Sequence, residues 1–210
     1  PSRFGKRKIR HWNLYYTGYF DAATSFRHAL FQTVSIASTT GFASSDFNLW
    51  PDFSRYVLLL LMFVGGCSGS TAGGMKVSRF VILLKVTWAE LRRTIHPRLV
   101  YSIKMGGRNV PPVVVGNVTR FFYLYMIVFS TLTLLISLTG ISMLDSMGII
   151  AACMSSVGPA FGIVGPTATY ADVSTFGRLV VIAAMILGRL EIFTLLIIMR
   201  PDFWRVKRNW

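Results

Sequence analysis

Two short segments of this chain place hydroxyl side chains within two residues before a glycine, and neither contains an acid, a base or a thiol. They are SIASTTGF (residues 35–42, the first hydroxyl loop) and SSVGPA (residues 155–160, the second hydroxyl loop). The polar atoms that they offer are mainly hydroxyl and backbone carbonyl oxygens. Rings of backbone carbonyls replace the hydration shell of an ion in selectivity filters, so ion coordination is the chemistry that fits these residues. Taken alone, either loop also fits an ordinary glycine-containing turn.

The composition indicates an integral membrane protein. The chain is 53% hydrophobic and only 14% charged, with a mean hydropathy of +0.54, whereas soluble domains carry roughly 25% charged residues. Its 22 Lys and Arg against 8 Asp and Glu give a formal charge of +14. These basic residues lie beside apolar segments, so they indicate membrane flanks in contact with lipid, and we expect no nucleic-acid partner.

Other kinds of functional site find little support. Cys67 and Cys153 are isolated, so they form neither a disulfide framework nor a CxxC metal motif. His11, His28 and His96 are scattered along the chain. With no carboxylate pair or histidine cluster, we expect no enzyme activity, no cofactor and no transition-metal site.

A glycine-rich string, GGCSGSTAGGMK (residues 65–76, the break loop), invites comparison with a phosphate-binding P-loop. Gly69 and Gly74 have the GxxxxG spacing, but Met75 stands where the lysine should follow, and no apolar strand leads into the string. A membrane-anchored nucleotide-binding subunit therefore remains only an alternative function.

The segment before the first hydroxyl loop predicts a short helix. Residues 22–34 would extend only about 20 Å, which is less than the hydrocarbon thickness of about 30 Å. We therefore expect a re-entrant half-helix that presents residues 35–42 at membrane depth, and we expect those residues to be too short and irregular for a helix. Irregular backbone at that depth is tolerated where it lines a cavity or a water-filled path.

The next apolar segment is broken by glycine and serine. A helix is predicted to begin near residues 51–54 and to run to Gly66, and another to resume at Val77. Each glycine in a helix interior costs close to 1 kcal/mol relative to alanine. A break of this kind in a membrane segment is expected to line a cavity or to act as a hinge.

The second half of the chain repeats this order. Residues 121–144 carry no charge and predict a full transmembrane helix that ends near Gly140. Residues 145–154 are apolar and too short to span, and they lead into the second hydroxyl loop. An apolar segment follows at residues 176–199, and a basic tail ends the chain.

The two hydroxyl loops occupy corresponding places in these repeats. Placing Gly41 over Gly158 aligns Thr39 with Ser156, so each loop carries a hydroxyl residue two positions before its glycine. Two loops do not surround an ion, because a carbonyl-ring filter needs about four. Either two copies of the chain meet, or a longer protein supplies two more loops. The start at Pro1, without an initiator methionine, favours a piece of a longer protein.

The chain resembles the Trk/Ktr/HKT superfamily of potassium transporters, most closely the C-terminal half of a bacterial Trk-type membrane subunit. The similarity covers roughly residues 22–205. It is carried by FRHALFQTVSIASTTGF, GGCSGSTAGGMKVSRFVILLK, LRRTIHPRLVYSIKMGGRNVP, SSVGPAFG and MILGRLEIFTLL.

This resemblance implies an all-α integral membrane fold with four M1–pore-loop–M2 repeats in one protein, including re-entrant half-helices and a broken M2 helix. Residues 1–95 would hold the pore helix, filter and broken M2 of the third repeat. Residues 96–112 would be a cytoplasmic linker, and residues 113–210 the fourth repeat with its basic tail.

The resemblance also assigns filter residues, with potassium as the transported ion. The third and fourth filter strands would be formed by Thr39, Thr40, Gly41 and Phe42, and by Ser156, Val157, Gly158 and Pro159. The fourth strand departs from the family's usual Asn-Asn-hydrophobic-Gly-Pro-Gly at Ser155, Ser156 and Ala160. A less selective K⁺/Na⁺ transporter is therefore an alternative.

The resemblance further implies a gate below the filter. The gating loop would consist of Gly65, Gly66, Cys67, Ser68, Gly69, Ser70, Thr71, Ala72, Gly73 and Gly74. Arg189, in the string GRLE, would act as an electrostatic barrier to cations. A charge in the middle of an apolar span normally faces a bundle interior or water, although a structural ion pair made by Glu191 is the alternative.

The family implies a homodimer in the bacterial inner membrane, bound on the cytoplasmic side to a ring of nucleotide-binding regulatory subunits. Residues 76–112 and the C-terminus would be cytoplasmic, in agreement with the positive-inside rule. Residues 1–19 would lie outside, where their basic residues fit that rule poorly. A passive membrane anchor is a further alternative, which the two re-entrant patterns oppose.

Overall fold

The computed structural model describes residues 22–67, 69–70, 72–96 and 103–189 of the 210-residue chain. Within these residues the fold is mainly helical, as predicted. It also contains two short pairs of two-residue strands, which the prediction of an all-α fold did not include. Each strand pair closes a loop and forms no layer of its own.

Helix α1 (Ala22–Ala37) is longer than the half-helix that we predicted at residues 22–34. It takes in the start of the first hydroxyl loop, so our expectation that the whole loop is irregular was wrong. Ser35 and Ile36 are buried on this added turn. The Ser35 hydroxyl donates to the Phe42 carbonyl at 2.6 Å, which offsets the cost of burying it.

Helix α2 (Asp52–Phe63) begins where the sequence predicts, with Pro51 before it and Asp52 in its first turn. It ends before Gly66, because the chain turns into strand β1 (Val64–Gly65). This strand pairs in parallel with β2 (Met75–Lys76), and helix α3 (Val77–Ile95) follows at once. The predicted interruption is therefore present, and pairing of β1 with β2 joins the start of the break to its end.

The segment after α3 contains a short hairpin. Strands β3 (Lys104–Met105) and β4 (Arg108–Asn109) pair in an antiparallel manner around two glycines of positive φ. The Lys85 ammonium donates to the Lys104 carbonyl at 2.6 Å, which ties the hairpin to α3.

Helix α4 (Pro112–Ser137) begins earlier than the uncharged segment at residues 121–144, and it ends close to Gly140, as predicted. Proline is favoured in the first turn of a helix, and Pro112 starts this one. The helix also contains the exposed Arg120, which precedes the uncharged residues 121–144. Within the described residues, α4 is the helix whose length and composition would suffice to cross a membrane.

The second repeat continues with α5 (Met143–Met154), which matches the predicted half-helix closely. Two short 3-10 helices, η2 (Gly162–Val164) and η3 (Tyr170–Asp172), lie in the connection to α6 (Thr175–Arg189). A third, η1 (Phe47–Leu49), lies in the corresponding connection of the first half. The rest of the apolar segment predicted at residues 176–199 lies outside the described residues.

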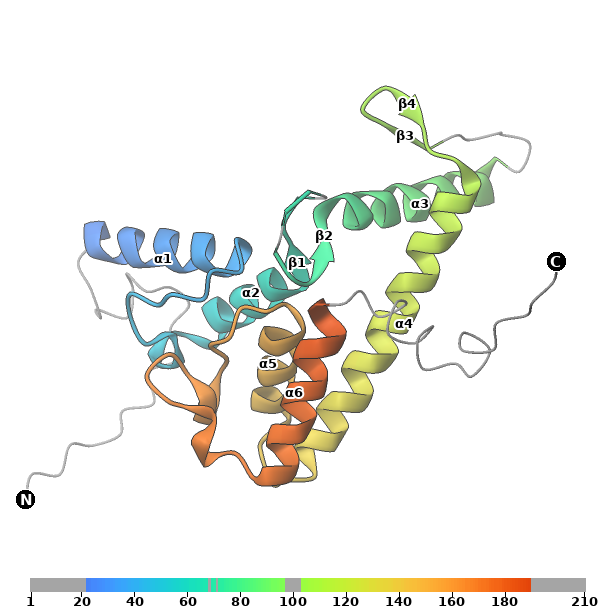
Figure 1. The fold of residues 1–210 in the computed structure, drawn as a ribbon. Coiled ribbons are helices and arrows are strands. Elements are labelled where there is room, and N and C mark those ends of the chain that lie inside the picture. The colour runs from blue at the N-terminus through green and yellow to red at the C-terminus, as the bar shows by residue number, and fades with distance from the viewer. Residues whose placement is uncertain (1–21, 68, 71, 97–102, 190–210) are drawn as a thin grey trace, which may run out of the picture.

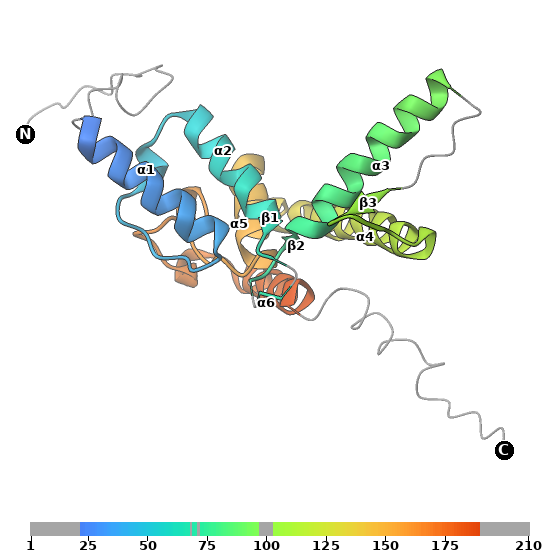
Figure 2. The ribbon, with the colours of Figure 1, turned by 90° about the horizontal axis from the view of Figure 1, so that it is seen from above.

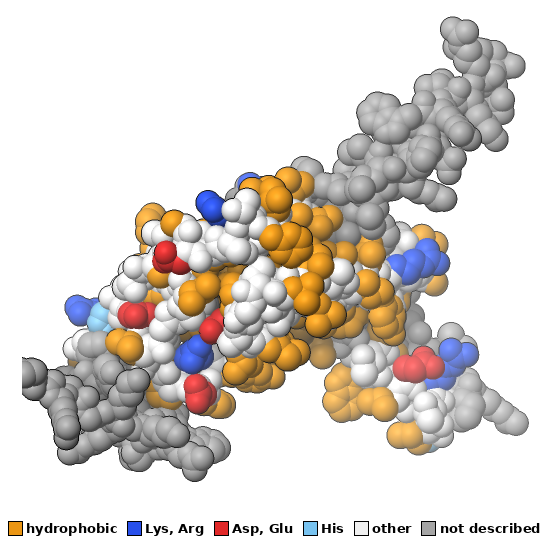
Figure 3. All heavy atoms as spheres, turned by 90° about the horizontal axis from the view of Figure 1, so that it is seen from below, with side chains coloured by type: hydrophobic (Ala, Val, Ile, Leu, Met, Phe, Trp, Pro, Cys, Tyr) orange, Lys and Arg blue, Asp and Glu red, His pale blue; other side chains and the backbone are white. Residues whose placement is uncertain are grey.

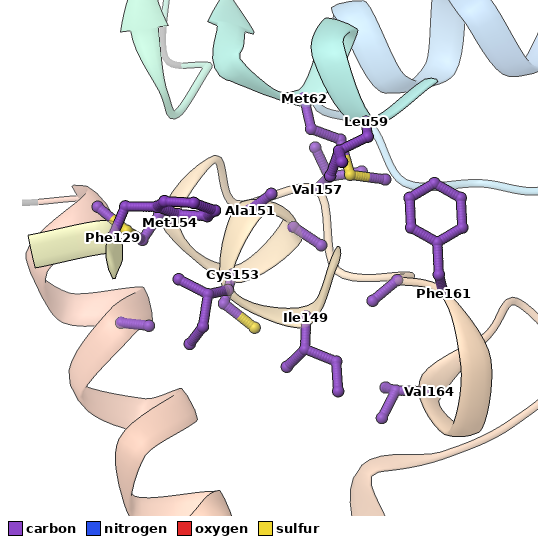
Figure 4. Packing of buried hydrophobic residues seen from close by; sticks show 14 of the residues in the cluster. Leu59, Met62, Phe129, Ile149, Ala151, Cys153, Met154, Val157, Phe161 and Val164 are labelled. Carbon is purple, nitrogen blue, oxygen red and sulfur yellow. The ribbon is translucent and has the colours of Figure 1, made fainter. Parts of the chain in front are cut away.

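Helix α5 forms the centre of the fold and packs against α2, α4 and α6 (Figure 1). The side chains from Ile149 to Met154 are almost completely buried. Leu59 and Met62 of α2 approach Val157 just after the helix, and Phe129 of α4 lies beside Met154 (Figure 4). The core therefore encloses helix α5, the half-helix of the second half.

Helices α1 and α3 lie at the periphery. Seen from above, α1 lies on one side of α5, and α3 projects away on the other (Figure 2). Hydrophobic side chains cover much of the face seen from below (Figure 3). Such a large apolar surface agrees with the membrane location that the composition indicates.

Candidate ion-binding site

The two hydroxyl loops meet in the fold. A Cβ placed on Gly41 would collide with the carbonyl oxygen of Val157 and would come within 3.2 Å of the Pro159 ring. The Val157 oxygen is nearer to that position than the Val157 carbon, so this carbonyl is directed at Gly41. Only a residue without a side chain fits here, and the backbones of the two loops touch as a result.

The loops also share two left-handed backbone positions. Thr39 and Ser156 have φ values of 55° and 58°, and Gly41 and Gly158 have φ values of 80° and 98°. Glycine adopts such values readily, but a residue with a side chain pays about 1 kcal/mol or more. The alignment of Gly41 with Gly158 therefore extends to backbone conformation, including two left-handed hydroxyl residues that the sequence did not predict.

Hydrogen bonds at the helix ends explain the left-handed hydroxyl residues of both loops. In the first loop, Thr39 N–H donates to Ile36 O at 3.0 Å and Thr40 N–H donates to Ser35 O at 2.9 Å. Bonds of this register form a Schellman motif, whose left-handed position is Thr39 and is usually occupied by glycine.

The second loop repeats the motif at the aligned positions. Ser156 N–H donates to Cys153 O at 3.1 Å, and Val157 N–H donates to Ala152 O at 2.9 Å. Both half-helices thus point their C-terminal ends at the loops. A helix C-terminus carries a partial negative charge, which favours a cation nearby.

Two loop carbonyls accept hydrogen bonds from side chains of their own half. Ser35 donates to Phe42 O at 2.6 Å in the first loop, and the Tyr170 hydroxyl donates to Gly158 O at 2.6 Å in the second. Burial raises the pKa of Tyr170, so its hydroxyl remains protonated and able to donate. Neither donor was predicted from the sequence. In the case of Tyr170 the reason is that it follows Gly158 by many residues, and no local pattern connects the two.

The break loop packs against the second hydroxyl loop. A Cβ on Gly73 would collide with the Ser155 carbonyl oxygen and come within 2.9 Å of Ser156 Oγ. The Ser155 hydroxyl donates to the Met62 carbonyl at the end of α2. Ser155 is completely buried, so its side chain satisfies the backbone where α2 breaks, a role that the sequence did not reveal.

The Lys76 side chain stabilises the break loop by hydrogen bonds to its backbone. The Lys76 ammonium donates to the carbonyls of Ser70 and Ala72, at 2.7 and 2.6 Å. Cys67 and Gly69 are exposed, and a Cβ on Gly69 would meet nothing within 4 Å. Of the residues predicted to form the gate, Ser68 and Thr71 lie outside the described residues.

Arg189 ends the described part of α6. Its neighbour Gly188 lies against the Met154 carbonyl, where a Cβ would collide. The backbone of α6 therefore reaches the C-terminal end of α5, one residue before Ser155. The Arg189 side chain is exposed in this chain, and its predicted alternative partner, Glu191, lies outside the described residues.

A further contact joins the segments that follow the two loops. Asn48 donates to the Gly162 carbonyl at 3.2 Å, and Gly162 N–H donates to Asn48 Oδ1 at 2.9 Å. Arg55 of α2 lies 3.8 Å from an Asp145 oxygen of α5 and 5.4 Å from the Phe161 ring centre. These contacts hold the two halves in register beside the loops.

The family follows from comparison with known proteins. The sequence model of the TrkH family, described as cation transport proteins, matches residues 11–205. The chain belongs to the TrkH family. The predicted resemblance to a Trk-type membrane subunit is thereby confirmed.

Several TrkH-family relatives are closely similar. The chain is 45% identical over 190 residues to the Trk system potassium uptake protein TrkH of Vibrio parahaemolyticus, covering 90% of this chain and 38% of that protein. It is 38% identical over 193 residues to TrkH of Halomonas elongata, covering 92% and 40%. It is 34% identical over 197 residues to TrkG of Escherichia coli, covering 94% and 40%.

The fold agrees with a solved TrkH-family structure. The crystal structure of the potassium transporter TrkH from Vibrio parahaemolyticus matches with a TM-score of 0.80 and 43% identity, over 90% of this chain and 40% of that one. The chain thus spans about two fifths of the length of these relatives.

Proposed function

We propose that this chain contributes the third and fourth strands of a four-repeat selectivity filter through which potassium ions are taken up into the cell. One observation carries the proposal: two loops with matching left-handed positions meet, with the Val157 carbonyl directed at Gly41. Selectivity filters are built where several such loops meet, because a ring of their backbone oxygens replaces the hydration shell of an ion. The residues concerned are Thr39 to Phe42 and Ser156 to Pro159.

The half-helices support the same function. Both α1 and α5 direct their C-terminal ends at the loops, and their partial negative charge lowers the energy of a cation there. Transporters of other architectures coordinate Na⁺ or H⁺ at the ends of such half-helices. Two strands make half a ring, and the two further strands would come from the part of the relatives' length that this chain does not span.

The gate is proposed to consist of the break loop and Arg189. The break loop contacts Ser155 at the base of the fourth strand, so its movement would change the path directly below the filter. Arg189 lies next to the residue that touches the end of α5. A guanidinium there would oppose the passage of cations, because its charge is always present.

The whole protein is proposed to be a homodimer in the bacterial inner membrane, with a ring of nucleotide-binding regulatory subunits on its cytoplasmic face. Residues 76–112 and the C-terminus would lie on that side. In the described part of this stretch, Arg92, Arg93 and Arg108 are exposed. Their positive charges would suit a surface that faces anionic lipid or a regulatory subunit.

The less selective K⁺/Na⁺ transporter remains the second candidate. It is favoured by Ser155 and Ala160, which replace the residues usual in the fourth strand. Ser155 bonds to Met62 and Ala160 is fully buried, so both contribute to packing around the strand.

A flux assay on the full-length protein tests the proposal. The protein would be reconstituted into liposomes with a potassium gradient, and K⁺ and Na⁺ entry measured separately. We expect K⁺ entry above Na⁺ entry; equal entry favours the less selective transporter, and no ion entry would contradict the proposal.

Arg189→Ala should raise K⁺ flux several-fold by removing the barrier charge. The matched control is Arg178→Ala on the same helix, where the arginine is exposed and donates to Thr175 at 3.4 Å. It should leave the flux unchanged. Folded Arg189→Ala protein with wild-type flux would show that Arg189 has a structural role only.

A further inference from the structure

A tyrosine and a cysteine form a hydrogen-bonded chain behind the second hydroxyl loop. The Tyr170 hydroxyl donates to Gly158 O at 2.6 Å and lies 3.3 Å from Cys153 Sγ. A phenol has a single proton, and here it is given to the carbonyl. The Cys153 thiol is therefore the donor to the Tyr170 oxygen, so the order is thiol, phenol, carbonyl.

The surrounding structure holds both side chains in place. Cys153 lies on the last turn of α5 and is 1% exposed. Tyr170 begins η3, where the Thr169 hydroxyl accepts from Ala171 N–H at 3.4 Å, and the nearby Val173 is buried at 2% exposure. The connection from the loop to the next helix is longer here, over residues 159–174, than in the first half, over residues 42–51. This extra length carries Tyr170 to the loop.

The hydrogen bond from Tyr170 determines the direction of the Gly158 carbonyl in the second hydroxyl loop. The Val157 carbonyl is directed at Gly41 of the other loop, whereas the Gly158 carbonyl is directed at Tyr170. In the first loop the donor is Ser35. It donates to the carbonyl of Phe42, which follows Gly41, the residue aligned with Gly158. The two strands are therefore fixed at different carbonyls by different side chains.

We propose that Tyr170, supported by Cys153, is a positioning residue that sets ion selectivity by fixing the Gly158 carbonyl of the fourth filter strand. This inference rests on the proposed function. Selectivity has been attributed to the size of the filter and to the number and field strength of its carbonyls. Both change when the peptide after Gly158 is able to turn, because a carbonyl of unfixed direction adapts to the smaller sodium ion.

Selectivity measurements on the full-length transporter in liposomes test this role. Tyr170→Phe keeps the ring and removes the donor, so K⁺ entry should persist while the K⁺/Na⁺ flux ratio falls about fivefold, the effect of one lost hydrogen bond. Cys153→Ala should lower the ratio less, because Tyr170 still donates. Cys153→Ser should keep the wild-type ratio, because its hydroxyl is also a donor.

Tyr123→Phe is the matched control, since this tyrosine is exposed on α4, and its ratio should equal that of the wild type. An unchanged or raised ratio in Tyr170→Phe would overturn the inference while leaving the proposed function intact. If Tyr170→Phe transports neither ion, Cys153→Ala decides, and a wild-type ratio there overturns the inference. Wild-type protein that takes up no potassium instead contradicts the proposed function itself.

Discussion

The two half-helices reach the same loop geometry in very different surroundings. Helix α5 is enclosed by α2, α4 and α6, and its last two turns are almost completely buried. Helix α1 packs mainly on α2 and exposes four large apolar side chains, at 44–70% exposure. These are Phe26, Leu30, Phe31 and Val34.

The helix end and the loop itself encode the loop conformation. Both half-helices end in the same Schellman motif, with the same left-handed positions, although only one lies in a core. The packing around each half-helix instead determines which side chains support its loop. Tyr170 and Cys153 support the second loop, whereas Ser35 of α1 supports the first.

The largest expected difference lies between the two loop glycines. In Gly41→Ala the new methyl group would overlap the Val157 carbonyl, so the loops must separate, and we expect K⁺ flux in liposomes to be lost. A Cβ on Gly158 would meet nothing within 4 Å, and Gly158→Ala adds only the strain of its φ of 98°. We expect that variant to retain reduced flux.

Folding is the control for both variants. Each must elute as folded protein in detergent before the two fluxes are compared. Equal loss of flux in the two variants would mean that the left-handed conformation matters more than the contact between the loops.

The next difference concerns the break loop. In Gly73→Ala the methyl group would overlap the Ser155 carbonyl, so we expect a clear change in the fraction of time that single channels are open. Gly69→Ala is the comparison within the same loop, because its methyl group would enter open space, and its open fraction should change less. Ion preference, measured as the reversal potential, should be unchanged in both.

A shifted reversal potential with normal gating in Gly73→Ala would place this glycine in the filter and not in the gate. A change of open fraction as large in Gly69→Ala would show that glycine flexibility, and not the contact with Ser155, controls the loop.

Local signals in the sequence predicted the order of elements well. Apolar length distinguished the half-helices from the span, and glycine density predicted the break after α2. The predicted bounds of the helices were less accurate, for physical reasons. Ser35 extends α1 because its buried hydroxyl finds a carbonyl in the loop, and α4 tolerates Arg120 because that side chain is exposed.

Contacts between distant residues could not be predicted from the pattern. Ser155 is bonded to Met62, Asn48 to Gly162, and Tyr170 to Gly158, and each of these bonds depends on the folded arrangement. The candidate filter residues were found because two strings repeat at matching places. The side chains that support them do not repeat, so comparison of the two halves gave no signal for them.

The smallest expected effect tests whether the two helix ends are equivalent. Thr39→Gly removes both the hydroxyl and the strain of a left-handed residue, whereas Thr39→Ala removes the hydroxyl and keeps the strain. The glycine variant should therefore be more stable than the alanine variant by about 1 kcal/mol. Thermal unfolding in detergent measures this difference, and Ser156→Gly and Ser156→Ala should give the same order.

Ion flux in these four variants separates the roles of backbone and hydroxyl. If the carbonyls alone coordinate the ion, the glycine variants should keep the wild-type K⁺/Na⁺ ratio. If the ratio falls at Ser156 but not at Thr39, the hydroxyls of the two loops differ in function despite their matching left-handed positions. A glycine variant no more stable than its alanine partner would contradict the Schellman explanation at that helix end.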